Sequence, residues 1–325
     1  MRRFLLVFLV SAAAGCGPDA PTPESLLQRS ELLLGRDRPA EAVVVLDEAI
    51  GLRPGDVELL TQRGIARERA GDLDAAIADY TAAIAAGDAP AALNNRAAIA
   101  ARRGDTDAAL ADLEASLAID PQQSMAHANR AIIRLDAGQP DAAIADLLEV
   151  ERLAPGQSET ARLLGLAYDA IGLADPAGAS LTEAVRRDDT SAVAHRDLGR
   201  HLRSRGRTAE ALASLRRAAS LDASLPIGDE LAAVGRRSRA EAELTAAGFT
   251  TFTVATPPFS LAADGRGVLL VPGPQPTLSR TDVDALRATP DAIVLVLDGD
   301  RVTRLEASAI DLDRLQPAAF ILPVE

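Results

Sequence analysis

The sequence predicts a mainly α-helical protein: an α-solenoid of about six helical hairpins with a capping helix, followed by a small α+β domain. Three observations predict this fold class. Glycines recur at intervals of 33 or 34 residues, small and large residues keep fixed distances from each glycine, and β-branched runs replace alanine and leucine after residue 247. A period near 34 residues is typical of stacked helical pairs, in which each pair buries its apolar face against the next.

The repeated frame is built on five glycines, which we expect to end the first helix of each hairpin because glycine readily adopts a left-handed backbone. They are Gly71, Gly104, Gly138, Gly172 and Gly206. A small residue lies seven positions before each glycine and an alanine five positions after it, which are Gly64, Ala97, Ala131, Gly165 and Gly199, then Ala76, Ala109, Ala143, Ala177 and Ala211. These residues are expected where the two helices cross most closely. A large residue nine positions after each glycine is expected to fill the space between neighbouring hairpins, namely Tyr80, Leu113, Leu147, Leu181 and Leu215.

This frame resembles that of the tetratricopeptide repeat (TPR) family. Segments such as Asn95-Arg96-Ala97, Gly104-Asp105 and Ala109-Leu110-Ala111-Asp112 are similar to that family's usual sequence. The resemblance places six units at residues 23–56, 57–90, 90–123, 124–157, 158–191 and 192–225. In the first unit Asp37-Arg38-Pro39 replaces the turn glycine. Residues 226–246 are expected to form a final helix that covers the apolar face of the last repeat, so the solenoid would span residues 24–246.

The first 16 residues resemble a bacterial lipoprotein signal peptide. Arg2-Arg3 precede an apolar stretch from Phe4 to Ala14, which is too short to span a bilayer because a spanning helix needs about 20 residues. Ala13-Ala14-Gly15-Cys16 is similar to a lipobox, in which the cysteine is acylated and becomes the new N-terminus. Lipidation of Cys16 would anchor the chain to the membrane. The alternative is an ordinary cleaved signal with an incidental cysteine.

Residues 17–23 are expected to form a proline-rich tether to the membrane surface. Because Gly17 rather than an aspartate follows Cys16, the resemblance to bacterial sorting signals favours the outer membrane, facing the periplasm. Cys16 is the only cysteine, which excludes a disulfide within the chain. The formal net charge of −13 disfavours nucleic acid or anionic lipid headgroups as the main partner.

Residues 247–325 are expected to form a small α+β domain of unknown role. Residues 250–255 alternate between apolar and polar side chains, whereas 268–271 and 292–297 are continuous apolar strands. Asp264-Gly265 and Asp298-Gly299 are hairpin signals. A short helix is expected over residues 281–287, a helical turn over 311–315 and a last strand over 319–324.

No group of residues in the sequence predicts catalysis, a cofactor or a metal site. The three histidines, His127, His195 and His201, are spaced for packing or surface roles. Gly265-Arg266-Gly267 lies in a predicted hairpin rather than before a helix, so it does not predict phosphate binding. Asp298-Gly299-Asp300 lacks the further ligands of a calcium loop. We therefore predict a protein that is not an enzyme and has no cofactor.

The family resemblance implies that the first helices line a concave groove that binds a partner polypeptide. Asn95 and Asn129 recur at one slot of this groove, and an amide can pair with an extended peptide because it both donates and accepts. Arg196, Arg200 and Arg203 share one helix face. The groove residues carried over are Gln62, Asn94, Asn95, Asn129, Arg162, Arg196, Arg200 and Arg203.

The four groove arginines form a predicted basic strip that could clamp a carboxylate terminus or an acidic segment of the partner. The alternative is a solvated helix face that is balanced by Asp197 and nearby acids. The predicted function is thus a membrane-anchored scaffold for protein–protein interaction at the bacterial cell envelope. Two further possibilities stay open. The C-terminal domain could be a catalytic or carbohydrate-binding unit positioned by the solenoid, or its strands could fold back into the groove and regulate access.

Overall fold

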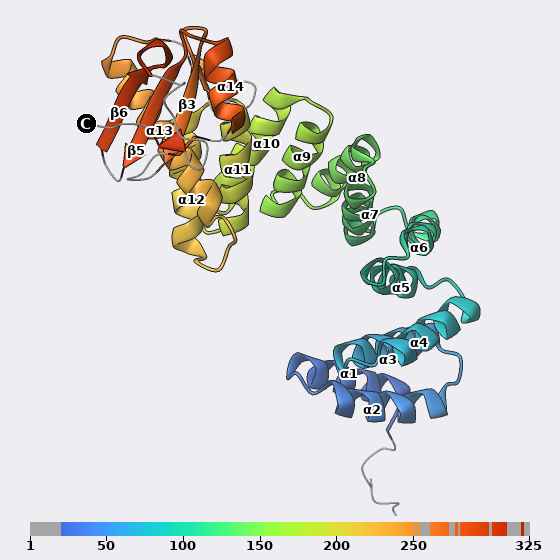
Figure 1. Ribbon diagram of the computed structural model, residues 1–325. Helices are drawn as coiled ribbons and strands as arrows, with labels where there is room; N and C mark the ends of the chain where they lie inside the picture. The colour runs from blue at the N-terminus through green and yellow to red at the C-terminus, as the bar shows by residue number, and fades with distance from the viewer. Residues whose placement is uncertain are drawn as a thin grey trace, which may run out of the picture. The chain divides into compact units, whose positions relative to one another are not determined.

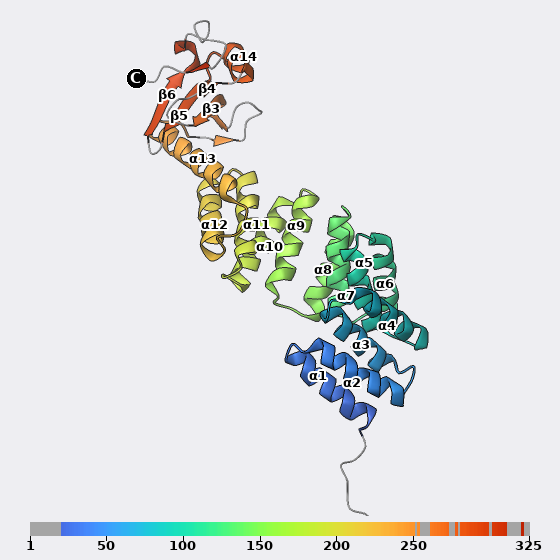
Figure 2. The same ribbon diagram turned by 60° about the horizontal axis from the view of Figure 1, so that its bottom comes forward.

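The computed structural model describes residues 21–250, 252–253, 261–272, 277–278, 280–298, 301–310 and 320–321. The chain divides into two compact units, residues 1–133 and 134–325, and the division falls within helix α7. Figures 1 and 2 show paired helices over most of the described chain and a sheet near its C-terminal end. The predicted signal peptide, Cys16 and residues 17–20 of the tether lie outside the described residues.

The first unit consists of helical hairpins. Its helices are α1 (Pro23–Gly35), α2 (Pro39–Leu52), α3 (Val57–Arg69), α4 (Leu73–Ala86), α5 (Pro90–Arg102), α6 (Thr106–Ile119) and most of α7 (Ser124–Asp136). Helices α1 and α2, α3 and α4, and α5 and α6 pack against each other in pairs. The observed helices therefore follow the predicted repeat period.

The second unit contains further helices and a sheet. Its helices are α8 (Pro140–Leu153), α9 (Ser158–Ala170), α10 (Ala174–Arg187), α11 (Ala192–Ser204), α12 (Thr208–Leu221), α13 (Gly228–Ala246) and α14 (Arg280–Ala288). Its strands are β1 (Phe252–Thr253), β2 (Leu261–Ala263), β3 (Arg266–Pro272), β4 (Thr277–Leu278), β5 (Ile293–Asp298), β6 (Arg301–Glu306) and β7 (Phe320–Ile321), with a 3₁₀ turn at Ala307–Ala309. Helices α9 and α10, and α11 and α12, form its hairpins.

Local chemistry explains where the helices end. The turn glycines have φ values of 88°, 81°, 71°, 79° and 75° in chain order, the left-handed region that glycine adopts at little cost. After α3 the N–H of Asp72 donates to the carbonyl of Arg67 at 2.9 Å, which satisfies a carbonyl at the helix end. Asp37, with φ 56°, takes the place of glycine in the first hairpin. The glycine positions predicted from the sequence are therefore helix ends.

The packing inside a hairpin depends on a large residue of the second helix that lies on a small residue of the first. A Cβ atom added to Gly64 would lie 2.7 Å from Cδ1 of Tyr80, and one added to Gly165 would lie 2.5 Å from Cγ of Leu181. The large residues are fully buried at this position in all five hairpins, as 0% exposure shows for Tyr80, Leu113, Leu147, Leu181 and Leu215. Close packing of this kind leaves no space for an extra methyl group.

The large residues were expected to fill the space between neighbouring hairpins, and the apolar clusters agree, because Leu113 packs in one cluster with Ala126 and Ile133 of the next first helix. Tyr80 and Leu181 also lie on the small residue of their own hairpin. Tyr80 also shares an apolar cluster with Leu60 and Ile99, so it reaches the first helix of the next hairpin as well. The large residue therefore contributes both to the packing within a hairpin and to the stacking of repeats.

Helix α13 belongs to two apolar cores at once. Near its N-terminal end, Val234 packs in a cluster with Leu202 and Leu215 from α11 and α12. Near its C-terminal end, Ala240 and Leu244 pack against β2, β3 and β5. The expected boundary at residue 247 therefore falls after a helix that the repeats and the sheet share.

The sheet has the strand order β1-β2-β3-β5-β6, and β4 pairs separately with β7. Strands β3 and β5 are parallel and the other pairs are antiparallel. Along β5, Ile293 and Leu295 face the cluster with α13, whereas Val294 and Val296 face a cluster with Val283 and Leu286 of α14. Both faces of β5 are thus covered by a helix, which explains why its sequence is apolar throughout.

Both predicted hairpins are present. Asp264 and Gly265 join β2 to β3 with φ values of 46° and 83°, as a two-residue type I′ turn requires. Strands β5 and β6 pair from Asp298 opposite Arg301, although residues 299–300 lie outside the described residues. The predicted helix over residues 281–287 is α14, and the last strand is β7, while the turn predicted over 311–315 is also outside the described residues.

In the described part of the chain, no helix combines the length and apolar character that crossing a bilayer requires.

A first prediction concerns the contact between Tyr80 and Gly64. We expect Gly64→Ala to lower the free energy of unfolding by about 1–3 kcal/mol, because the added methyl group overlaps a fully buried ring. Adding Tyr80→Leu should recover part of this loss, since the third hairpin already combines Ala97 with Leu113. Urea unfolding followed by circular dichroism measures both effects. Equal stability of Gly64→Ala and wild type would contradict this account of the packing.

A second prediction separates the two cores that α13 joins. Leu244→Ala should destabilise by about 2–5 kcal/mol, and hydrogen exchange should show lost protection first in β3 and β5, which Leu244 covers. Val234→Ala is the matched control, because Val234 lies in the same helix and is 2% exposed. Its effect should fall first on α11 and α12. Indistinguishable exchange patterns for the two variants would show that α13 does not divide its contacts in this way.

Candidate functional site

The first helices of the first unit carry a row of amide side chains. Asn129 on α7 donates through Nδ2 to Oδ1 of Asn94 on α5 at 2.9 Å. Asn94 is 6% exposed, so this amide joins two neighbouring repeats and is largely removed from solvent. Gln62, Asn95 and Asn129 are half-buried and keep part of their polar surface accessible. Of the four amides predicted from the sequence, these three are less buried than Asn94.

A polar cluster lies beside Asn95. The Tyr80 hydroxyl donates to Oε2 of Glu68 at 3.0 Å, and Glu68 also pairs with Arg102 of the next first helix. Asn95 lies within hydrogen-bonding reach of the same hydroxyl, and burial raises the pKa of Tyr80, with the charge of Glu68 adding to the effect. The phenol therefore remains a neutral donor, and the cluster holds α3, α4 and α5 together.

Helix α7 presents apolar side chains on the same stripe as Asn129. Met125 is 69% exposed and Ile132 is 39% exposed. Residues 125, 129 and 132 are spaced by four and three positions, so they share one helix face. An amide between two exposed apolar side chains can bind the backbone and the side chains of an extended polypeptide together.

The predicted basic strip in the second unit is matched by acidic residues. Asp197, which is 4% exposed, accepts from Arg162 at 2.6 Å and from Arg196 at 2.9 Å. Arg162 also pairs with Glu159 at 2.6 Å, and these hydrogen bonds raise the pKa of Arg162. The guanidinium of Arg162 is thus already held by two carboxylates.

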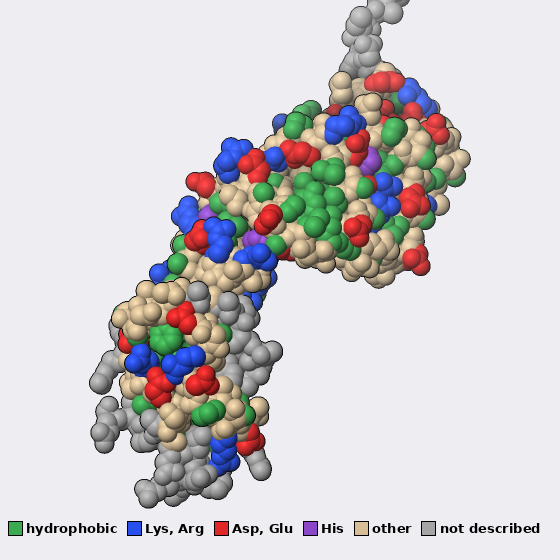
Figure 3. Space-filling view, turned by 90° about the horizontal axis from the view of Figure 1, so that it is seen from above, with side chains coloured by type: hydrophobic (Ala, Val, Ile, Leu, Met, Phe, Trp, Pro, Cys, Tyr) green, Lys and Arg blue, Asp and Glu red, His purple; other side chains and the backbone are tan. Residues whose placement is uncertain are grey.

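The outer end of the strip is less firmly held. Arg200 and Arg203 share Glu230 of α13, at 2.9 Å and 3.6 Å, and their side chains are 47% and 49% exposed. Figure 3 shows the same intermixing on one face of the molecule, where basic and acidic side chains lie next to each other. The structure therefore brings the four arginines together with acids that any acidic partner would have to displace.

The histidines occupy two kinds of position. Nε2 of His127 lies 3.0 Å from the carbonyl of Pro121, and Nε2 of His195 lies 3.2 Å from the carbonyl of Asp189. In both cases the acceptor is six residues upstream, so the two side chains fill equivalent structural positions. His201 differs, because it is 6% exposed and its Nδ1 lies 2.8 Å from Oδ1 of Asp169 on α9.

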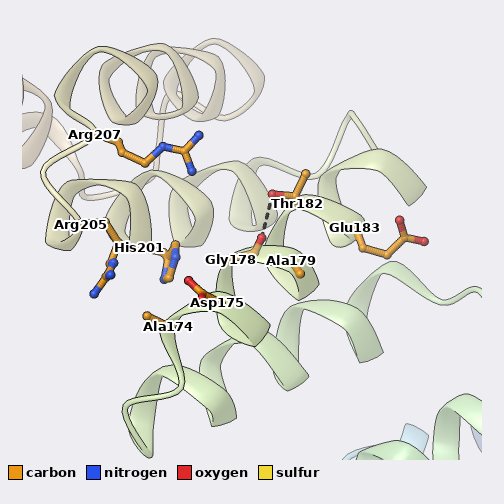
Figure 4. Close-up of a pocket in the computed structure, with 9 residues that line it drawn as sticks. All are labelled: Ala174, Asp175, Gly178, Ala179, Thr182, Glu183, His201, Arg205 and Arg207. Atoms are coloured by element: carbon orange, nitrogen blue, oxygen red, sulfur yellow. Dashed lines mark hydrogen bonds between the residues drawn. The ribbon is translucent and has the colours of Figure 1, made fainter.

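A pocket of about 570 Å³ lies beside His201. Figure 4 shows it between α10 and the turn that connects α11 to α12, with Asp175 and Arg205 flanking the imidazole. Thr182 donates to the carbonyl of Gly178 at 2.7 Å at the edge of the pocket. Sequence reasoning missed this pocket, although a histidine at a position that is Ala or Ile in the preceding four repeats was a usable signal.

The other candidate positions have structural roles. Arg266 donates to the carbonyl of Asp291 at 2.6 Å, pairs with Glu306 and lies 5.8 Å from the ring centre of Phe249. Gly299 and Asp300 lie outside the described residues. Over the ranges that the structure describes, His, Cys, Asp and Glu form no group of three or more that could hold a metal ion.

A family model for the tetratricopeptide repeat matches residues 27–87, 61–124, 128–192 and 164–226, which together exceed half of the chain. The chain therefore belongs to the tetratricopeptide repeat family, and the resemblance seen in the sequence is confirmed. Its class is that of repeat scaffolds for protein–protein interaction, whose members are generally not enzymes.

Solved structures show the same fold. PilF from Pseudomonas aeruginosa is similar with a TM-score of 0.59 and 16% identity, over 65% of this chain and 96% of that one. A tetratricopeptide repeat protein from Parabacteroides merdae has a TM-score of 0.52 and 18% identity, over 68% and 92%. The structure of the APC/C hetero-tetramer Cut9–Hcn1 gives 0.56 and 15%, over 65% of this chain and 42% of that one, so this chain spans about two fifths of it. No curated protein matches the chain.

A third prediction tests whether Asp197 holds the basic strip together. Asp197→Ala should lower the free energy of unfolding by about 3 kcal/mol, because it leaves two largely buried guanidiniums without their shared acceptor. Glu210→Ala is the control, since it removes the partner of Arg207 from an exposed ion pair and should leave the midpoint unchanged. Urea titrations of the two variants give the comparison. Equal midpoints would mean that Asp197 is not the centre of this network.

Proposed function

We propose that this chain is a membrane-anchored, non-enzymatic scaffold that holds an extended partner polypeptide against the exposed face of its first helices. The observation that carries the proposal is the α7 stripe, where the half-buried Asn129 lies between the exposed side chains of Met125 and Ile132. Membership of the tetratricopeptide repeat family supports the same class of function.

In this proposal an acidic segment of a partner binds Arg200 and Arg203 in the second unit. These two guanidiniums are about half exposed and share a single carboxylate, so together they retain an excess of positive charge. Arg162 and Arg196 have a supporting role, because Asp197 already occupies them. An acidic segment would form charge-assisted hydrogen bonds with the outer pair.

The proposed location is the bacterial cell envelope, with the lipid on Cys16 inserted in the outer membrane and the repeats in the periplasm. The support is the sequence alone: a short apolar stretch, a lipobox-like Ala13-Ala14-Gly15-Cys16, and Gly17 after the cysteine. A lipid anchor would place the repeats close to the membrane surface, since only a short tether separates Cys16 from α1.

A fourth prediction addresses the anchor. Wild-type protein expressed in a double-membraned bacterium should incorporate labelled palmitate and sediment with outer membranes, whereas Cys16→Ser should incorporate none and appear in the soluble envelope fraction. A second substitution, Ser11→Ala, leaves the cysteine in place and should label normally. Palmitate incorporation by Cys16→Ser would reject lipidation at this residue.

A fifth prediction tests the binding face. A photo-crosslinking residue at Met125 should capture a partner polypeptide in the native cell, while the same residue at Val44 should not. The two positions are matched in exposure, at 69% and 67%, but Val44 lies on a second helix. Stronger capture through Val44 than through Met125 would contradict binding on the first helices.

A further inference from the structure

The pocket beside His201 replaces an apolar contact that the earlier repeats make. At the fifth position of each second helix stand Val43, Ile77, Leu110, Ile144, Gly178 and Leu212. Val43, Ile77 and Leu110 pack in the same clusters as Ala66, Ile99 and Ile133, which lie at the tenth position of the next first helix. At the junction of α10 with α11 the corresponding residues are Gly178 and His201.

The glycine and the histidine at this junction fit each other sterically. A Cβ atom on Gly178 would lie 2.8 Å from Nε2 of His201, so the imidazole occupies the space that an aliphatic side chain fills elsewhere. An imidazole is smaller than the Ile77 and Ile99 side chains together, and a pocket of about 570 Å³ opens next to it. Pockets of this size suit small molecules.

The hydrogen bond to Asp169 determines what His201 offers to the pocket. A carboxylate oxygen accepts, so Nδ1 carries the hydrogen, and Nε2 of the neutral ring is left as an acceptor. In the described part of the chain Nε2 has no hydrogen-bond partner, while the side chain as a whole is 5% exposed. An acceptor without a protein partner in the lining of a pocket favours a ligand that donates a hydrogen bond.

The charges at the rim contrast with those of an earlier repeat. At the α4–α5 junction, Arg103 and Asp74 form an ion pair of 2.7 Å. Arg205 and Asp175 hold the same two places at the α10–α11 junction, and both line the pocket. Within the described ranges, neither has an ion-pair or hydrogen-bond partner.

The other charged residues at the pocket are already neutralised. Arg207 makes two hydrogen bonds to Glu210, at 2.6 Å and 2.7 Å. Hydrogen bonds from Arg186 and Arg187 lower the pKa of Glu183 to about 2, so this carboxylate is ionised and occupied. The pocket therefore presents one free cation, one free anion and one acceptor to a ligand.

We propose that this pocket binds a small zwitterionic amino compound, a free amino acid or a short peptide. Its ammonium group donates to Asp175 and to Nε2 of His201, and its carboxylate accepts from Arg205. A ligand with a net negative charge would face Asp175 without compensation, and one with a net positive charge would face Arg205 in the same way. This site is separate from the polypeptide-binding face of the proposed function and does not depend on it.

The proposal is tested with diglycine as the probe and the full chain as the receptor, by observing the imidazole signals of the three histidines in NMR. Diglycine should shift the His201 signals saturably and leave those of His127 and His195 in place. Acetyl-diglycine lacks the ammonium and diglycinamide lacks the carboxylate. Each should bind at least about tenfold more weakly, because each loses a charge-assisted hydrogen bond. A parallel titration with glycine shows whether a single amino acid is sufficient.

Variants provide the matched controls. Arg205→Gln and Asp175→Asn should each weaken binding by about tenfold or more, whereas Arg103→Gln and Asp74→Asn, at the closed junction, should not change it. The double variant Gly178→Ile with His201→Ala introduces the pair found at Ile144 and Ala167. It should fold, fill the pocket and lose diglycine binding, which calorimetry measures because the His201 signal is absent from this variant. No saturable shift, equal binding of the analogues with one charge, or unchanged binding by Arg205→Gln would overturn the proposal.

Discussion

The repeats depend on the contact between one large buried residue of each second helix and one small residue of the first helix in the same hairpin. The distance between the two backbones is set by this contact, because neither Tyr80 on Gly64 nor Leu181 on Gly165 leaves space for another carbon atom. Tyrosine occurs opposite glycine, while leucine occurs opposite either alanine or glycine. The hairpins can therefore vary in sequence and still stack with one period.

Polar contacts between repeats add a second level of organisation. Asn129 with Asn94, Arg102 with Glu68, and Arg162 with Asp197 each join first helices about one repeat apart in sequence. These pairs tie neighbouring first helices together and also use up part of the polar surface to which a ligand could bind. The groups that remain accessible, such as Asn129 and the outer arginines, are therefore better guides to binding than the full set of polar residues.

The sequence predicts the repeats well because their signal is local. A turn glycine, a small residue and a large residue at fixed spacing identify each hairpin, and the structure has the glycines in the left-handed conformation. The apolar runs at 268–271 and 292–297 identify β3 and β5 for the same reason. Such patterns can be found without knowledge of contacts that are distant in sequence.

The parts that were not predicted depend on distant contacts. Glu230, which neutralises the outer end of the strip, is 30 residues from Arg200, so composition and spacing did not pair them. Asp197, next to Arg196, was the balancing acid that the sequence did offer. The pocket at His201 needs Gly178 from the preceding hairpin, and neither residue alone indicates a cavity. The shared role of α13 was hidden because Ala240 and Leu244 look like ordinary helix residues until the sheet lies against them.

That shared helix has a consequence for the order in which the chain matures. The residues that cover Ala240 and Leu244 follow them in the sequence, so they leave the ribosome later. Until β3 and β5 have formed, the C-terminal half of α13 exposes the apolar side chains of Ala240 and Leu244 to solvent. A chaperone that covers this half of the helix would be needed only until the sheet has formed.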